Sequence, residues 1–399
     1  MVNAPADFTA GGAEKHVQEL SRELQERGHE LAFLHAFPSP SRTYPPDTTV
    51  LHSADWRRSQ VRRYRNLVDD WASFPSDRLR RVVAGYRPDV VHTHSLVGIA
   101  TGLWEVCRRM DVPVVHTLHD YQLLCPRKSL MQPNGEPCRP HPLLCGLRAR
   151  RMVRWAPAVS NVVGVSEFIL GVHRQMFARA RQHLIMHPVV PPALRPLRPP
   201  GDRLRTIGYI GQMHVIKGIR ELIAAAPHLA ERGVAVKLAG QGRYSNDAVE
   251  AAARIPGFEY VGYVGGREKE DFLESCDVGI VPSVWNEPGA PSYTALEWLC
   301  GGRPVLTSAR GGLGEALDIV SGSIVIEPTS DGIVEAVDRL IDPEVWAAAV
   351  ADVSAVSGEG EFERWTTAYE AVYERAHDRD SSSETVVSRP SGPRSARPT

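Results

Sequence analysis

The feature that most limits the possible folds is an alternation of short apolar runs with helical stretches, which occurs twice along the 399-residue chain. Runs at residues 89–92 and 206–210 have the length and apolar character of buried strands. Between such runs apolar residues recur at helical spacing, as Val17, Leu20 and Leu24 do. The pattern predicts an α/β protein of two Rossmann-like domains, each a doubly wound parallel sheet.

A proline-rich segment separates the two halves of the pattern. Residues 189–201 contain five prolines and are predicted to form a linker. We therefore assign residues 1–188 to a first domain and residues 202–350 to a second. Only Val2 and Asn3 precede the first loop, so the first strand of the first domain is expected to be cut short.

Composition and charge exclude several classes of protein. Hydrophobic residues make up 43% and charged residues 23%, and no window approaches eighteen apolar residues, which excludes a membrane-spanning helix. Residues 1–200 carry 27 basic and 17 acidic side chains, a net charge of +10, which leaves −11 for residues 201–399. This asymmetry favours a basic first domain that meets an anionic acceptor or membrane surface, and drift in surface composition is the alternative.

Two glycine turns suit the binding of a phosphorylated ligand. Gly11 and Gly12 precede the first helix, where backbone amides can approach an anion. A second turn begins at Gly211 and leads to Lys217, whose ammonium group can reach a diphosphate. The alternatives are an ordinary strand-to-helix turn for the glycines and a solvated surface side chain for the lysine.

The segment 281–306 carries the strongest pattern in the chain. A strand ends, an acidic loop contains Glu287, a helix carries Glu297, and Gly302 and Pro304 lead into the next strand. Together with other motifs it resembles the retaining glycosyltransferases of the GT-B fold, family 4, from Gly11 to about Tyr373. The other matching segments are residues 11–14, 116–121, 124–127, 165–168, 217–218 and 261–264. The resemblance implies two Rossmann-like domains facing a central cleft.

The resemblance also implies the roles of individual residues. His119 would hydrogen-bond the donor sugar, Lys217 would neutralise the leaving diphosphate, and Glu287 would reach the sugar, so these three are the predicted catalytic residues. For His119 the alternative is a strand-end histidine satisfied by backbone. No Asp-x-Asp motif occurs within the two predicted domains, so neither a cofactor nor a divalent cation is expected for donor binding. The predicted donor-binding residues are Gly12, Gly211, Gln212, Lys217, Tyr263, Gly289, Ala290 and Glu297, the last accepting both ribose hydroxyls.

Two departures from the family pattern bear on activity. Gln212 stands where the family usually has an arginine that pairs with the lysine on the diphosphate, and Arg220 is a candidate substitute. Glu287 and Glu297 have nine residues between them, where the family has seven, and the usual position of the first glutamate falls on Gly289. Either the loop bulges so that Glu287 still reaches the sugar, or backbone groups have taken its role.

A proline-rich loop contains four soft metal ligands, and we predict a structural zinc site there. The alternative is that unrelated thiols share one loop. The predicted ligands are Cys125, Cys138, His141 and Cys145.

Arginine-rich runs at residues 57–65 and 148–154 favour peripheral contact with an anionic membrane or a phosphate-bearing acceptor. The alternative is a solvated helix face. Nucleic-acid binding is disfavoured because no aromatic platform accompanies the charge.

Aromatic residues near the end of the chain form one stripe at helical spacing, from Phe362 to Tyr373. The stripe predicts a helix over 361–377, and the resemblance implies that this helix crosses back and packs on the first domain, packing on the second being the alternative. Residues 378–399 are rich in Ser, Arg and Pro and are expected to be a disordered tail.

The sequence therefore predicts a retaining glycosyltransferase of the hexosyltransferase type (EC 2.4). It would move a sugar from a nucleoside-diphosphate sugar to a glycan, lipid-linked or small natural-product acceptor. It is expected to be cytoplasmic, or peripheral to the inner face of the membrane. The alternatives are a weakly active protein that binds a sugar nucleotide as a regulatory or partner subunit, and a nucleotide-sugar epimerase or hydrolase.

Overall fold

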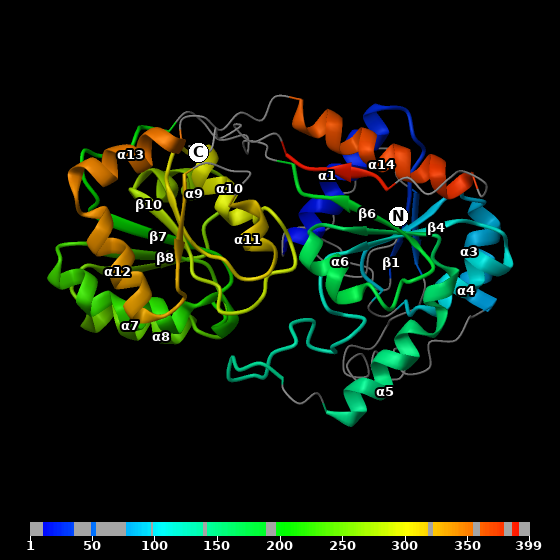
Figure 1. Ribbon diagram of the computed structural model, residues 1–399, viewed down its shortest axis with the longest axis horizontal. Coiled ribbons are helices and arrows are strands. Elements are labelled where there is room, and N and C mark those ends of the chain that lie inside the picture. The colour runs from blue at the N-terminus through cyan, green and yellow to red at the C-terminus, as the bar shows by residue number, and fades with distance from the viewer. Residues whose placement is uncertain are drawn as a thin grey trace, which may run out of the picture. The chain divides into compact units, whose positions relative to one another are not determined.

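The computed structural model describes residues 11–35, 49–52, 77–96, 99–138, 142–188, 197–317, 322–353, 360–378 and 385–390 (Figure 1). The chain forms two compact units. Unit 1 comprises Met1–Leu130, Cys138–Met186 and Phe362–Arg389, and unit 2 comprises Met131–Pro137, His187–Glu361 and Pro390–Thr399. The expected shortened first strand lies outside the described residues. No helix in the described part of the chain is long and apolar enough to cross a membrane.

Unit 1 is built on a parallel sheet in the order β13-β6-β5-β4-β3, with a separate parallel pair β1-β2. Its strands are β1 (Ala32–His35), β2 (Thr49–His52), β3 (Val91–Thr93), β4 (Val114–Leu118), β5 (Asn161–Gly164), β6 (Arg181–Ile185) and β13 (Val387–Ser388). Its helices are α1 (Gly12–Glu26), α3 (Asp77–Tyr86), α4 (Gly102–Arg109), α5 (Leu143–Met152), η1 (Val153–Ala158), α6 (Glu167–His173) and α14 (Glu361–His377).

Unit 2 contains a six-stranded parallel sheet in the order β12-β11-β10-β7-β8-β9. Its strands are β7 (Thr206–Ile210), β8 (Ala235–Ala239), β9 (Phe258–Gly262), β10 (Val278–Val281), β11 (Val305–Ser308) and β12 (Ser323–Ile326). Its helices are η2 (Val215–Lys217), α7 (Ile219–Glu231), α8 (Ser245–Arg254), α9 (Gly266–Glu274), α10 (Tyr293–Cys300), α11 (Gly312–Ala316), α12 (Ser330–Leu340) and α13 (Pro343–Val353). The chain goes to β8 on one side of β7 and later to β10 on the other, so the strand order reverses between β7 and β10.

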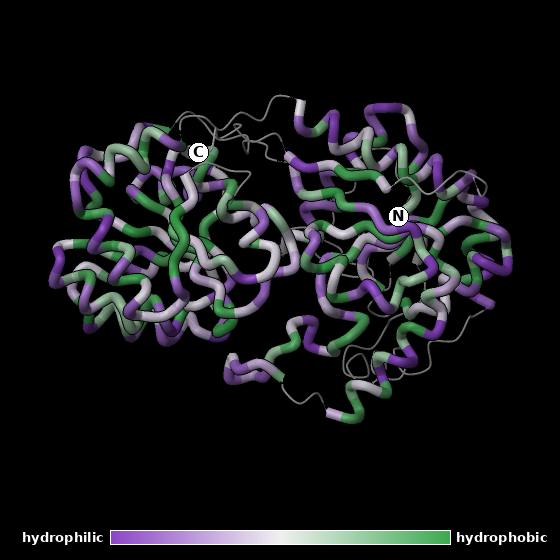
Figure 2. The backbone as a smooth tube through the Cα atoms, in the orientation of Figure 1, coloured by the Kyte–Doolittle hydropathy of each residue, from purple (hydrophilic) through white to green (hydrophobic). Residues whose placement is uncertain are grey.

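Glycines in the two central strands of unit 2 allow one helix to pack closely on the sheet. A Cβ atom at Gly208 of β7 or at Gly279 of β10 would overlap with the indole ring of Trp298. Trp298 belongs to α10 and is fully buried. The small strand residues therefore fix α10, which also carries Glu297, against the two strands at the reversal point. Figure 2 shows apolar segments along the strands and polar segments on the outer turns of the helices.

Helix α14 packs on unit 1 although it follows unit 2 in the sequence (Figure 1). Trp365, Tyr369 and Val372 join a buried cluster with Leu20 of α1 and Val115 of β4. Polar contacts flank this cluster, and the Arg27 guanidinium lies 2.5 Å from the carboxylate of Glu370. The aromatic stripe of the sequence is therefore the buried face of this helix.

The expected disordered tail is wrong for residues 385–390. Val387 and Ser388 form β13, which pairs in parallel with Leu184 and Ile185 of β6. The backbone N–H of Val386 donates to Nδ1 of His183 (2.9 Å). The segment is too short and polar to show a strand period, and it gains order because an edge strand offers it backbone partners.

Acidification is expected to destabilise unit 1. Burial lowers the pKa of His116 to about 3 and of His183 to about 4. His183 donates through Nε2 to Asn161 while its Nδ1 accepts from Val386, which requires the neutral ring. Because the unfolded chain takes up these protons near pH 6.5, the stabilisation is complete above about pH 6.5 and is lost as the pH falls toward the folded values.

Pulse proteolysis in urea at about pH 7.5 and about pH 5 would measure this loss, with fragments of the two units separated by mass spectrometry. Unit 2 serves as the internal control, because it contains neither His116 nor His183. Equal losses of stability in the two units between these pH values would contradict the assignment of the effect to His116 and His183.

Candidate active site

The reversal point of the unit 2 sheet brings together the loops that follow β7 and β10. Gly218, with φ of +77°, ends the first loop, and a Cβ there would overlap with the carbonyl oxygen of Pro282 in the second. Only glycine fits this left-handed, close approach. In addition, the N–H of Val284 donates to the Ile216 carbonyl (3.1 Å). The crevice at the carboxyl ends of such strands is where open α/β sheets bind ligands.

Lys217 and Glu287 form a partly buried ion pair at this point. The Lys217 ammonium lies 2.5 Å from Oε1 of Glu287, and the hydroxyl of Ser283 donates to the same oxygen at 2.5 Å. Burial alone would raise the pKa of the Glu287 carboxyl, but Lys217 and the hydrogen bonds from Ser283 and Trp285 outweigh it and lower the pKa. The carboxylate is therefore charged and oriented, and the ammonium lies 5.5 Å from the centre of the Trp285 ring.

The loop after Glu287 absorbs the two additional residues between the glutamates. The backbone carbonyl of Glu287 accepts from the N–H of Gly312 (2.7 Å), and the backbone N–H of Glu287 donates to the carbonyl of Arg310 (3.2 Å). The backbone of Glu287 thus forms a short parallel bridge with Gly311. Gly289 and Ala290 follow in the loop before α10, and the carbonyl of Ala290 accepts from the N–H of His187 (3.0 Å). Glu287 and not Gly289 therefore lies against the lysine.

Glu297 is held by a residue that carried no sequence motif. Its carboxylate lies 2.6 Å from the ammonium of Lys269 on α9, and both side chains are largely buried. Lys269 occupies an ordinary position in a charged helix, so nothing in the sequence distinguished it. Tyr263, the residue expected near the nucleobase, follows the edge strand β9 and is 63% exposed.

Gln212, which stands where the family usually has an arginine, and Arg220, the candidate substitute, have other partners in the structure. The hydroxyl of Tyr209 donates to the carbonyl of Gln212 (2.8 Å), and Gly211 directly follows β7. The Arg220 guanidinium donates to the carbonyl of Asn134 (3.4 Å), in the short segment 131–137 that belongs to unit 2. Arg220 is therefore directed to this segment, and Lys217 is the cation that lies against Glu287.

In unit 1, the predicted donor-site residues are His119 and Gly12, which lie on different elements. His119 follows β4, and its neighbour Asp120 lies 3.3 Å from the ammonium of Lys128. Gly12 is the first residue of α1. In the same turn burial raises the pKa of Glu14, while Lys128 opposes this change.

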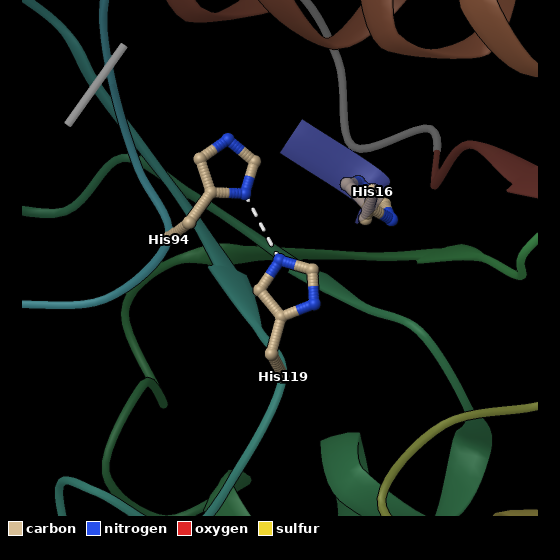
Figure 3. Close-up of side chains that lie close together, drawn as sticks. All are labelled: His16, His94 and His119. Carbon is tan, nitrogen blue, oxygen red and sulfur yellow. Dashed lines mark hydrogen bonds between the residues drawn. The ribbon is translucent and has the colours of Figure 1, made fainter. Parts of the chain in front are cut away.

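His119 belongs to a cluster of three histidines (Figure 3). Nδ1 of His94 and Nε2 of His119 share a hydrogen bond of 2.9 Å, and the centre of the His16 ring lies 4.6 Å from that of His119. His16 and His94 are buried, and His119 is partly buried. His16 was not among the residues predicted from the sequence, although His16, Leu20 and Leu24 lie at the spacing of one helix face, a signal that predicts its burial.

The predicted zinc ligands are not brought together in the described residues. Cys125 is buried, Cys138 and Cys145 are partly buried, and the one potential metal-binding group found among the described residues is the histidine cluster. His141 lies outside the described residues. Zinc binding by this loop stays a prediction.

Comparison with known families and structures agrees with this architecture. The profile for Glycosyltransferase Family 4 matches residues 10–191, and that for Glycosyl transferases group 1 matches residues 204–343. A curated relative is the 2-deoxystreptamine N-acetyl-D-glucosaminyltransferase of Streptomyces fradiae, 27% identical over 93% of this chain and 94% of the relative.

Solved structures share the whole fold. Sucrose-phosphate synthase from Thermosynechococcus elongatus superposes with a TM-score of 0.67 and 16% identity, covering 94% of this chain and 97% of the other. Anabaena HepE in complex with UDP superposes with a TM-score of 0.68 and 15% identity, covering 94% and 98%. The two Rossmann-like units and the two profiles, one for each half, identify the chain as a GT-B glycosyltransferase of the family 4 type.

Proposed function

We propose that this glycosyltransferase moves a sugar from a nucleoside-diphosphate sugar to an acceptor hydroxyl with retention of the anomeric configuration. The observation that carries the proposal is the Lys217–Glu287 pair at the reversal point of the unit 2 sheet. It supplies a positive charge for a diphosphate and a carboxylate for a sugar at a position where such sheets bind nucleotides. HepE, a protein of similar fold, forms a complex with UDP, and this supports a nucleotide ligand here.

The proposed reaction breaks the bond between the anomeric carbon and a phosphate oxygen. Negative charge grows on the leaving diphosphate, and Lys217 together with the N-terminus of α10 would stabilise it. Retention requires the acceptor oxygen to arrive on the face that the diphosphate leaves, so the nearest base for the acceptor proton is the departing phosphate oxygen. Glu287, fixed by Ser283, would orient the sugar, and His119 would donate a hydrogen bond to one of its hydroxyls.

Glu297 is proposed to bind the ribose of the donor. Two carboxylate oxygens match two adjacent hydroxyls, and Lys269 holds one of them in place. We expect Glu297→Ala to lower kcat/KM by about 30-fold to 1000-fold, because it removes this contact and leaves the Lys269 ammonium without its partner.

Steady-state kinetics with varied donor would measure this loss. Glu259→Ala is the matched control, because Glu259 forms a more exposed ion pair with Lys237 elsewhere in unit 2. Equal kinetics for Glu297→Ala and the unchanged protein would contradict the ribose assignment.

A donor panel tests the function as a whole. Uridine-, adenosine- and guanosine-diphosphate sugars are screened by thermal shift and then incubated with and without candidate acceptors. Release of nucleoside diphosphate together with a glycosylated product of retained configuration supports the proposal. Binding without turnover would favour a regulatory subunit, and turnover without acceptor would favour an epimerase or hydrolase.

We also propose that α5 is the part of unit 1 that contacts an anionic membrane surface. Leu143 and Leu144 are 88% and 68% exposed, and the exposed side chains of Arg150, Arg151 and Arg154 follow in and just after the helix. An apolar helix end beside cations matches the boundary of an anionic bilayer. Co-sedimentation with anionic but not neutral vesicles, lost in Leu143→Asp/Leu144→Asp, is the expected result. Equal binding to both kinds of vesicle would contradict it.

A further inference from the structure

We propose that His16, His94 and His119 form a binding site for one divalent transition-metal ion of the zinc type. Their ligand nitrogens all lie within 4.8 Å of one another. The three residues come from separate elements of unit 1: His16 from α1, His94 from the turn after β3, and His119 from the turn after β4. The site goes beyond the proposed function, because its geometry rests on residues of unit 1 alone, although it shares His119 with the proposed sugar contact.

The ring positions are close to those of a ligated ion. Figure 3 shows the rings of His94 and His119 turned toward each other, with His16 beside them on the helix. A tetrahedral ion with metal–nitrogen distances of about 2.0–2.1 Å needs nitrogens roughly 3.4 Å apart. The 2.9 Å between Nδ1 of His94 and Nε2 of His119 would widen slightly, and His16 would move inward by about one ångström.

The kind of ligand decides the kind of ion. The set contains three imidazoles and no carboxylate, so it suits zinc, cobalt, nickel or copper and not calcium or magnesium. Three protein ligands also leave the fourth position of a tetrahedral ion for water or an added ligand.

Neighbouring side chains already orient the rings. Nε2 of His16 lies 3.0 Å from the hydroxyl of Tyr369, a partner of the kind that fixes a metal-binding histidine through its other nitrogen. The ring of His92 lies against that of His94, with 3.9 Å between centres, and is itself held by Tyr373 (2.8 Å). With Nε2 of His16 turned to Tyr369 and Nδ1 of His94 turned to His119, the nitrogens left to bind the ion are Nδ1 of His16, Nδ1 of His94 and Nε2 of His119.

Cobalt spectroscopy on the full chain tests the proposal without using activity. Protein prepared without a histidine tag is stripped with chelator, dialysed and titrated with Co²⁺. Cys138→Ser/Cys145→Ser is titrated beside it, because those thiols belong to the loop predicted to bind zinc. We expect one equivalent of tetrahedral Co²⁺ with clear visible d–d bands, no thiolate charge-transfer band, and the same spectrum in both proteins. Absence of binding, or a thiolate spectrum that the serine variant abolishes, would overturn the proposal.

Substitutions in the histidine cluster test whether these residues bind the ion. His94→Asn and His16→Asn are expected to weaken Zn²⁺ binding by at least about 10-fold to 100-fold in competition with a chromophoric chelator. His228→Asn is the matched control, because His228 is an exposed histidine of α7 in unit 2. Unchanged affinity in folded cluster variants would overturn the assignment. If these variants do not fold, the cobalt spectrum of the serine variant decides the question. If the unchanged protein binds the ion but transfers no sugar from any donor of the panel, this site stands and the proposed function fails.

Discussion

Lys217→Ala is expected to lower kcat by about 100-fold to 1000-fold with the preferred donor. The ammonium of Lys217 lies beside Glu287 at the point where the strand order of unit 2 reverses, and in the proposed reaction it supplies the charge that the leaving diphosphate needs. Negative charge on the diphosphate grows as the sugar departs, so removing the Lys217 ammonium affects the transition state more than the bound donor. Single-turnover kinetics at saturating donor would measure the effect.

Two controls separate chemistry from folding. Lys237→Ala removes a lysine that is also paired, with Glu259, but away from the reversal point, and it should leave kcat unchanged. Lys217→Ala/Glu287→Gln avoids leaving a buried carboxylate without its cation, and it should recover thermal stability without recovering turnover. Turnover near that of the unchanged protein in Lys217→Ala would overturn the assignment of this residue.

Trp365→Ala is expected to destabilise unit 1 by about 3–5 kcal/mol, the range for removing a large buried aromatic side chain. Trp365 is 2% exposed and packs with Tyr369 of α14 and with Leu20 and Leu24 of α1. Helix α14 covers one face of the unit 1 sheet, so weakening its packing would expose that face. Hydrogen–deuterium exchange would show faster exchange in peptides from β4 and β5.

Trp346→Ala provides the matched control for this result. Trp346 of α13 is equally buried but belongs to the core of unit 2. It should accelerate exchange in β7 and β8 and leave β4 and β5 protected. If Trp365→Ala instead acts on unit 2, or on neither unit, the packing of α14 on unit 1 is wrong.

Patterns along the chain predicted those parts of the fold that depend on local periodicity. Apolar runs gave the parallel strands, and the aromatic stripe gave the buried face of α14. They did not predict how Trp298 packs over Gly208 and Gly279, because that contact joins three elements far apart in sequence. Nor did they predict β13, whose order comes from an available strand edge and not from its own residues.

The residues of the candidate site also divide into those that a sequence motif selects and those that only tertiary packing brings together. Lys217 and Glu287 could be selected by motif, but their ion pair depends on the close approach of two loops that Gly218 permits. The spacing of the glutamates left two interpretations open, and the contact of Glu287 with Lys217 shows which residue lies beside the lysine. Lys269 and the convergence of His16 with His94 and His119 are products of tertiary packing, for which no local pattern exists.

Calorimetric titration with a nucleoside diphosphate and with its nucleoside measures whether Lys217 binds the diphosphate of the donor. The base is that of the preferred donor, and both ligands are titrated into the unchanged protein and into Lys217→Ala. If Lys217 binds the diphosphate, the variant should bind the diphosphate about 10-fold to 100-fold more weakly and the nucleoside with unchanged affinity. Equal affinity of both proteins for the diphosphate would contradict the account.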